Sequence, residues 1–181
     1  MVQLLKLTNV YYLQRSTNSL LTQQFAEVGY AVVMIDFEGH GRSDGLHAYV
    51  ETLDHFEEDL NDYLTNHVMA LEDFRSKKLF LYGESMGGAI SFKLCISQKG
   101  ICSKISGVCL MAPMLKVADK MKPLDIVINI FKLIEKIIPR AAIAPVPDIL
   151  NKCFKNKRVL EMARNDTLAY KKQPVGFSCI A

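Results

Sequence analysis

The 181-residue chain lacks a strong charge of either sign, a long apolar run and a signal-like amino terminus. Its 22 basic and 19 acidic residues leave a formal charge of only +3, and the basic residues are scattered, so a nucleic-acid-binding surface is not indicated. No uninterrupted apolar stretch has the length that a membrane-spanning helix needs, and polar residues interrupt the amino-terminal segment where a secretory signal would be apolar. These absences predict a cytoplasmic protein and leave room for a peripheral contact with a membrane.

Cysteine is present but shows none of the patterns that would give it a structural role. The five cysteines are odd in number, lack the spacing of metal ligands and fall partly in apolar runs. They stand at positions 95, 102, 109, 153 and 179. We therefore expect buried, reduced thiols and no metal site.

Apolar and helical segments alternate through the first 115 residues. Short apolar runs, of the kind buried on both faces of a parallel sheet, occur at residues 31–35, 78–82 and 108–111. Helical patterns occur at residues 20–28, 51–73 and 85–97. This order predicts parallel strands joined by right-handed crossovers, with ligands bound at the carboxyl ends of the strands.

The sequence Gly83-Glu84-Ser85-Met86-Gly87 stands between the strand expected at 78–82 and the helix expected from residue 85. A serine forced into a sharp strand-to-helix turn needs neighbours without side chains, which glycine supplies on both sides. Gly88 extends that clearance. The helix amino terminus would then place positive potential near the hydroxyl, where an oxyanion could form.

From Pro113 onward the alternation stops, and the chain has the pattern of a helical insertion. Polar residues recur at steps of four, three and four between positions 125 and 138, which leaves a broad apolar face on the expected helix. Prolines at 139, 145 and 147 separate it from another helix expected at 149–162. The apolar face could pack on the domain itself, cover an acyl-binding pocket as a lid, or touch a membrane surface, and the sequence leaves these alternatives open.

Three segments together resemble the monoacylglycerol lipase-like α/β-hydrolases: residues 29–45, 83–88 and 110–114. The resemblance runs from about residue 17 to residue 174 and is nearest to the plant-type group that includes caffeoylshikimate esterase, among the serine aminopeptidase S33-like hydrolases. It implies an α/β-hydrolase fold and hydrolysis of one ester bond of a lipid or phenolic ester. It also implies a helical cap over the pocket and no metal or organic cofactor.

The resemblance assigns roles to a few residues. Ser85 matches the nucleophile, and Met86 matches the residue whose backbone N–H stabilises the oxyanion. The supporting glycines of the turn are Gly83, Gly87 and Gly88. His40 matches the histidine of the family's Gly-His-Gly loop, which is not the catalytic one, and we expect it to hold the turn after a strand.

Other parts of the family pattern have no match. The triad acid and histidine follow the nucleophile in the fold, whereas no histidine follows His67 in this chain. No glycine precedes Gly29, so the family's upstream His-Gly step is also missing. We therefore expect an incomplete, doubly wound, mostly parallel sheet in a chain truncated at both ends. Its parts would be a partial core at 17–114, a helical cap at 115–174 and termini outside the family at 1–16 and 175–181.

Two hypotheses about function follow. In the first, the chain is a serine ester hydrolase of the monoacylglycerol lipase or lysophospholipase type that cleaves a carboxylic ester of a lipid or phenolic acyl substrate through an acyl-enzyme on Ser85. In the second, it is a catalytically incomplete paralogue or fragment without the triad acid and histidine. Acyl transfer to an acceptor other than water shares the first half of the mechanism. The expected partner is a small acyl ester, with membrane contact through the cap and no nucleic acid.

Overall fold

The structure is a computed structural model that describes residues 2–8, 17–49, 51–98, 100–116 and 150–165, together with eleven positions between and beyond them: 127, 129, 130, 133, 134, 137, 138, 144, 145, 172 and 173. The chain divides into two compact units. The first comprises Met1–Asn9, Gln14–Ile35 and Asp54–Leu115, and the second comprises Val10–Leu13, Asp36–Leu53 and Lys116–Ala181. Each unit is described by itself.

The first unit is built on a four-stranded parallel sheet with the strand order β2-β1-β3-β4. The strands are β1 (Val2–Thr8), β2 (Tyr30–Met34), β3 (Leu79–Glu84) and β4 (Ile105–Met111). One row of paired positions, Val33, Leu5, Leu81 and Val108, crosses the whole sheet. The apolar runs at 31–35, 78–82 and 108–111 are therefore strands, as predicted.

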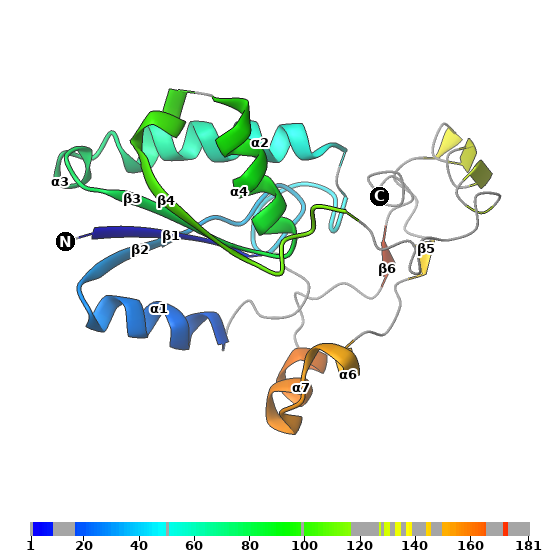
Figure 1. The fold of residues 1–181 in the computed structure, drawn as a ribbon. Helices are drawn as coiled ribbons and strands as arrows, with labels where there is room; N and C mark the ends of the chain where they lie inside the picture. The colour runs from blue at the N-terminus through cyan, green and yellow to red at the C-terminus, as the bar shows by residue number, and fades with distance from the viewer. Residues whose placement is uncertain are drawn as a thin grey trace. The chain divides into compact units, whose positions relative to one another are not determined.

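Helices cover both faces of this sheet (Figure 1). Helix α1 (Thr17–Glu27) lies on one face and packs against β2, whereas α4 (Met86–Ser97) lies on the other and packs mainly against β3. Helix α2 (Leu53–Asp62) lies on the same side as α4. Parallel strands with helices on both faces confirm the predicted α/β fold.

The helix predicted at 51–73 is broken in the structure. Helix α2 continues into a π-helical turn, η1 (Tyr63–Val68), and a short α3 (Glu72–Arg75) follows. The hydroxyl of Thr65 donates to the carbonyl oxygen of Asn61 at 2.7 Å, and the N–H of Met69 bonds five residues back to Leu64. A hydroxyl bonded to the carbonyl four residues back often bends a helix, and an apolar periodicity cannot reveal it.

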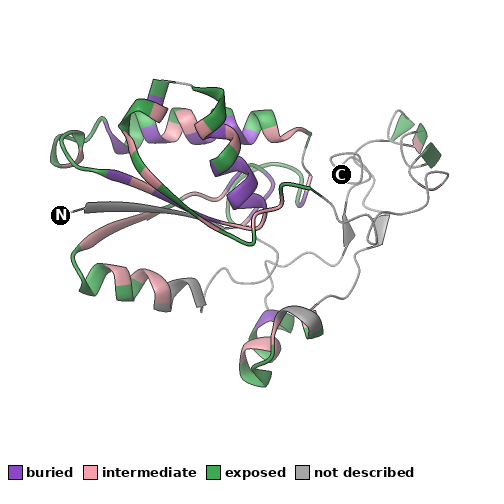
Figure 2. Ribbon diagram, viewed as in Figure 1, coloured by how far each residue is buried: buried purple, intermediate pink, exposed green. Residues whose placement is uncertain are grey.

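The core of the first unit lies between the sheet and the helices α2 and α4 (Figure 2). Its fully buried side chains come from these three elements and the adjoining η1: Leu60, Leu64, Leu79, Leu81, Met86, Ile90 and Leu94. Of the strands whose burial is described, β3 is buried most completely, whereas β4 at the sheet edge keeps exposed positions. The carboxyl end of β3 therefore emerges from the best-packed part of the unit.

The amino-terminal segment contributes a strand to the sheet. Residues 1–16 were expected to be a terminus outside the family, which stays a prediction, and residues 2–8 form β1, which pairs with β2 on one side and β3 on the other. The run Val-Gln-Leu-Leu-Lys-Leu-Thr is short and mixed, so its central place in the sheet comes from pairing and not from its composition.

In the second unit, the loop after β2 contains tight turns and buried side chains. Phe37, His40 and Ala48 are each at most 1% exposed. The amide of Gly39 donates to the carbonyl of Asp44 at 2.8 Å, and Gly39 has φ 70° with no room for a Cβ, which would meet the carbonyl oxygen of Leu46. A glycine is required at this position of the loop.

The carboxyl-terminal part of this unit contains α6 (Leu150–Cys153), α7 (Lys157–Arg164) and a two-residue antiparallel pair of β5 (Ala144–Pro145) with β6 (Lys172–Gln173). The single helix predicted at 149–162 is interrupted because Asn156 is extended and caps α7, accepting from the amides of Arg158 and Val159. Six described positions within the helix predicted at 125–138 are helical. The structure has no helix, among the described residues, that is long and apolar enough to cross a membrane.

Candidate active site

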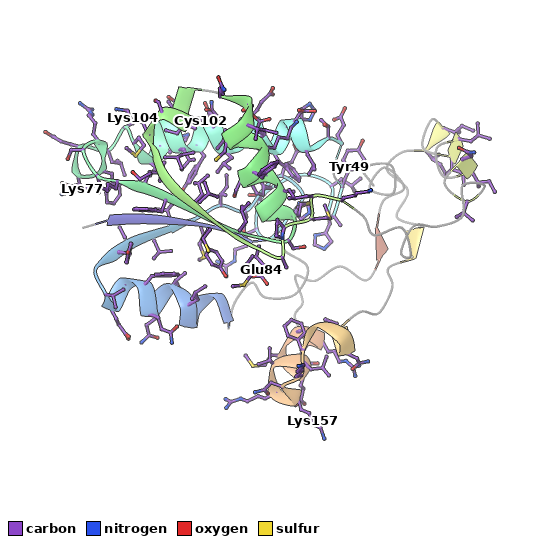
Figure 3. All side chains as sticks on the ribbon, in the orientation of Figure 1. Tyr49, Lys77, Glu84, Cys102, Lys104 and Lys157 are labelled. Carbon is purple, nitrogen blue, oxygen red and sulfur yellow. The ribbon has the colours of Figure 1, made fainter. Side chains whose placement is uncertain are left out.

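Ser85 occupies a sharp turn between a strand and a helix. Strand β3 ends at Glu84 and α4 begins at Met86, and Figure 3 labels Glu84 at the carboxyl end of β3. Ser85 has φ 53° and ψ −116°, a combination that residues with a Cβ rarely adopt. Strain of this kind costs about 1–3 kcal/mol and persists only where the surroundings impose it. The predicted geometry of the turn is therefore present.

Gly83, two residues before Ser85, is required by close packing. A Cβ on Gly83 would stand 2.6 Å from the carbonyl oxygen of Gly87 and 2.7 Å from Oγ of Ser91. That same carbonyl oxygen of Gly87 accepts a hydrogen bond from the buried Ser91 hydroxyl at 2.7 Å. The start of α4 thus lies directly against the end of β3, which fixes where the turn can run.

The backbone around Ser85 is held by hydrogen bonds from two directions. Its N–H donates to the carbonyl of Met111 at 3.0 Å, and its carbonyl accepts from Ala89 at 3.1 Å and from Met114 at 2.9 Å. The next amide, that of Met86, lies in the first turn of α4, where helix geometry supplies no intrahelical acceptor. This amide and the helix dipole suit a developing negative charge.

Burial around the turn leaves the serine reachable while its neighbours are packed. Met86 is 1% exposed, and Gly83, Gly87 and Gly88 are buried. Ser85 itself is half-buried. A hydroxyl on a rigid, partly open turn is suited to nucleophilic attack on a bound substrate.

His40, which was predicted to support a loop, does lie in one. Its Nδ1 is 2.8 Å from the carbonyl oxygen of Glu38, and the side chain is fully buried. Burial lowers the pKa of His40, with His47 adding to the decrease, while the Glu38 carbonyl and Asp36 act in the opposite direction. The neutral imidazole is therefore favoured.

The other histidines lie on exposed surfaces. His47 follows in the same loop, His55 is on α2, and His67 stacks on Tyr63 with ring centroids 5.8 Å apart. Of the acidic residues after Ser85, Glu161 is exposed on α7, and the others lie outside the described residues: Asp119, Asp125, Glu135, Asp148 and Asp166. The part of the chain that the structure describes contains no group of three or more metal-ligating side chains.

Sequence reasoning missed the turn at residues 111–114, which bonds to both polar backbone groups of Ser85. Ala112 in this turn has φ 42°, and a Cβ on Gly88 would meet the Cβ of Pro113 at 2.9 Å. No side-chain pattern marks these backbone bonds. The signals in the sequence are the resemblance of residues 110–114 to the family and the proline that ends the apolar run of β4.

The sequence matches a family model described as Hydrolase_4, serine aminopeptidase S33, over residues 14–178. Caffeoylshikimate esterase of Arabidopsis thaliana is 25% identical over 154 residues, which cover 85% of this chain and 46% of that protein. A monoacylglycerol lipase of Mycolicibacterium smegmatis is 28% identical over 119 residues, which cover 66% of this chain and 40% of that protein. The chain spans less than half the length of these curated relatives.

A solved structure gives the same fold. A soluble variant of monoglyceride lipase from Saccharomyces cerevisiae matches with a TM-score of 0.78 and 19% identity, covering 99% of this chain and 57% of that one. At this identity the likeness concerns the fold alone. The family model covers most of the chain, and the chain therefore belongs to the serine aminopeptidase S33 family, with part of an α/β-hydrolase fold of the monoacylglycerol lipase type.

Proposed function

We propose that Ser85 is the nucleophile of a carboxylic ester hydrolase. The observation that carries this proposal is the strained, half-buried serine at the carboxyl end of β3 with the amino terminus of α4 directly behind it. A strand-to-helix turn with these glycines is the structural context that the G-x-S-x-G pattern requires. The family match and both curated relatives support the proposal.

The reaction would proceed through an acyl-enzyme. The Oγ of Ser85 attacks the ester carbonyl carbon, and the electron pair of the carbonyl moves to oxygen, where the N–H of Met86 stabilises it. The bond to the alcohol then breaks, and the alcohol leaves with the proton that the serine lost. Water attacks the acyl group in the second half, which releases the carboxylic acid and restores the serine. If an alcohol takes the place of water, the same site performs acyl transfer.

The substrate class follows from the relatives. Their names refer to a phenolic ester and to monoacylglycerols, so we propose a lipid or phenolic acyl ester as the substrate of this site. The predicted cap at 115–174 would supply apolar surface for the acyl chain. No metal or organic cofactor is needed for this chemistry.

A second candidate is a catalytically incomplete form of the same site. Its support is that no histidine follows His67 in the sequence, whereas the fold takes its base from a position after the nucleophile. Removing triad members leaves only about a thousand- to ten-thousand-fold acceleration over water from the remaining site. In that form the chain would bind an acyl ligand without turning it over efficiently.

Covalent labelling separates the two candidates. A fluorophosphonate reacts with an activated serine, so we expect stoichiometric labelling of the folded chain and none of Ser85→Ala. Ser97→Ala is the matched control, because Ser97 is an exposed serine at the other end of the same helix. A folded wild-type chain that is not labelled would contradict the hydrolase and favour the incomplete form.

We further propose that the cap provides a peripheral membrane contact for a cytoplasmic protein. Ile130, Leu133 and Ile137 are each more than half exposed and recur at steps of three and four residues. An apolar helix stripe of this kind binds at a lipid interface. Flotation with phosphatidylcholine vesicles should retain the wild type and release Leu133→Glu, whereas Ser85→Ala should bind like the wild type.

A further inference from the structure

The turn at residues 111–114 is joined to Ser85 through both of its polar backbone groups. The Ser85 N–H donates to the carbonyl of Met111, and the Ser85 carbonyl accepts from the N–H of Met114, at 3.0 Å and 2.9 Å. In the sheet, Glu84 pairs with Met111, so these bonds begin where the ladder between β3 and β4 ends. The candidate nucleophile and this turn are therefore one hydrogen-bonded unit.

The turn is itself strained and tightly packed. Ala112 has φ 42°, in the left-handed region that residues with a Cβ rarely occupy. It precedes Pro113, which limits the conformations of Ala112 further. Pro113 lies against the first turn of α4. A Cβ on Gly88 would stand 2.9 Å from the Cβ of Pro113 and 3.0 Å from the Cα of Pro113.

We propose that residues 111–114 hold Ser85 in its reactive conformation, with Ala112 and Pro113 as positioning residues. This inference rests on Ser85 being the nucleophile. A turn that only ended β4 would not need a left-handed alanine, because a glycine forms such a turn without strain. Two strained residues, Ser85 and Ala112, persist together because the two hydrogen bonds between their segments and the contact of Pro113 with α4 keep each from relaxing.

Relaxation of the turn would move the hydroxyl. If Met111 and Met114 no longer bond to Ser85, its φ and ψ can return to a common region, and Oγ then points elsewhere. A misplacement of about 1 Å in a reacting group can cost roughly a hundredfold in rate. The turn therefore acts on the rate of serine attack more than on the stability of the fold.

The first test compares two glycine-to-alanine variants. Gly88→Ala places a Cβ 2.9 Å from the Cβ of Pro113 and 3.1 Å from the carbonyl oxygen of Gly83, whereas Gly100→Ala places one in open space, with nothing within 4 Å. A structural effect at position 88 is expected as well, so the thermal midpoint of each variant is measured beside its labelling rate. We expect Gly88→Ala to lower the fluorophosphonate labelling rate of the folded protein at least about tenfold, and Gly100→Ala to leave it unchanged.

The second test reads the conformation without the reaction. Amide hydrogen exchange should accelerate at Ser85 and Met114 in Gly88→Ala, while Leu81 in the middle of β3 stays protected. Ala112→Val should act in the same direction because a β-branched residue resists positive φ. If Ala112→Val does not fold, the exchange and labelling of Gly88→Ala still test the proposal.

The outcomes are distinct. The proposal is overturned if Gly88→Ala lowers only the thermal midpoint, with the labelling rate of the folded protein and the exchange at Ser85 and Met114 unchanged. If the wild type is not labelled at all, the hydrolase function fails. The exchange experiment then still shows whether the turn holds Ser85.

Discussion

The Nζ of Lys93 on α4 lies 2.7 Å from Oδ1 of Asp54 and 3.9 Å from Oε2 of Glu57, both on α2. The side chain of Asp54 is 63% exposed, whereas that of Glu57 is 2% exposed. One ammonium group therefore serves an exposed and a buried carboxylate. The pair joins α2 to the helix that begins beside Ser85.

Replacing Lys93 should destabilise the fold more than replacing Asp54. Lys93→Met removes the cation from the buried Glu57 carboxylate, whereas Asp54→Asn loses only an exposed ion pair of small value. We expect a lower thermal midpoint for Lys93→Met than for Asp54→Asn, measured by circular dichroism at neutral pH. Lys77→Met, at an exposed lysine, controls for the lost charge. Equal midpoints for Lys93→Met and Lys77→Met would show that the pair does not matter.

The same pair predicts a loss of stability in alkali. The hydrogen bond to Asp54 raises the pKa of Lys93 above its ordinary 10.5; burial opposes this increase, and the charges of Asp54 and Glu57 add to it. A raised pKa in the folded state adds stability below the ordinary value, which is lost as pH rises through the folded value. Lys93→Met should therefore lose less stability above about pH 10 than the wild type in urea titrations.

His40 should make the fold sensitive to mild acid. Burial lowers its pKa from the ordinary 6.5, so the unfolded chain binds a proton more readily than the folded one. Stability is then present above about pH 6.5 and falls as pH drops from there through the folded pKa. His40→Gln should flatten this slope in denaturant titrations between pH 5 and pH 7, and His67→Gln, at an exposed position of η1, should keep it. A slope that survives His40→Gln would assign it to another group.

The elements that sequence could predict are those whose signal is local. The runs at 31–35, 78–82 and 108–111 are strands because they are apolar and short, and the glycines at 83 and 88 mark a close approach that the structure confirms. A position where any side chain would clash accepts only glycine, so such a position can be recognised in the sequence. The catalytic role of Ser85 remains a prediction.

The features that sequence could not predict depend on partners far along the chain. Strand β1 is placed by pairing with β2 and β3, and the turn at 111–114 acts through backbone groups that every residue carries. The π-helical turn at η1, where the hydroxyl of Thr65 bonds to the helix backbone, likewise leaves no mark on the apolar periodicity. Patterns of side-chain polarity carry no information about such bonds.

The strain at Ser85 can be measured with two substitutions that both remove the hydroxyl. Glycine adopts φ 53° and ψ −116° freely, whereas alanine keeps the Cβ that makes this conformation costly. We expect Ser85→Gly to be more stable than Ser85→Ala by about 1–3 kcal/mol, less the entropy that glycine gains in the unfolded chain. Urea denaturation of the two variants gives the difference. An alanine variant as stable as the glycine variant would mean that the turn is unstrained.

The edge of the sheet at β4 should promote self-association. Among the described strands β4 pairs only with β3, its residues 105–111 carry no charge, and Val108 and Met111 are 37% and 49% exposed. Edge strands of monomeric proteins are usually protected by charge, proline or a covering element, because a bare edge pairs with other chains. We expect concentration-dependent association in sedimentation velocity, reduced in Val108→Lys. Val28→Lys makes the same change at a position 70% exposed after α1, so an equal effect of both lysines would assign the association to net charge and not to the edge.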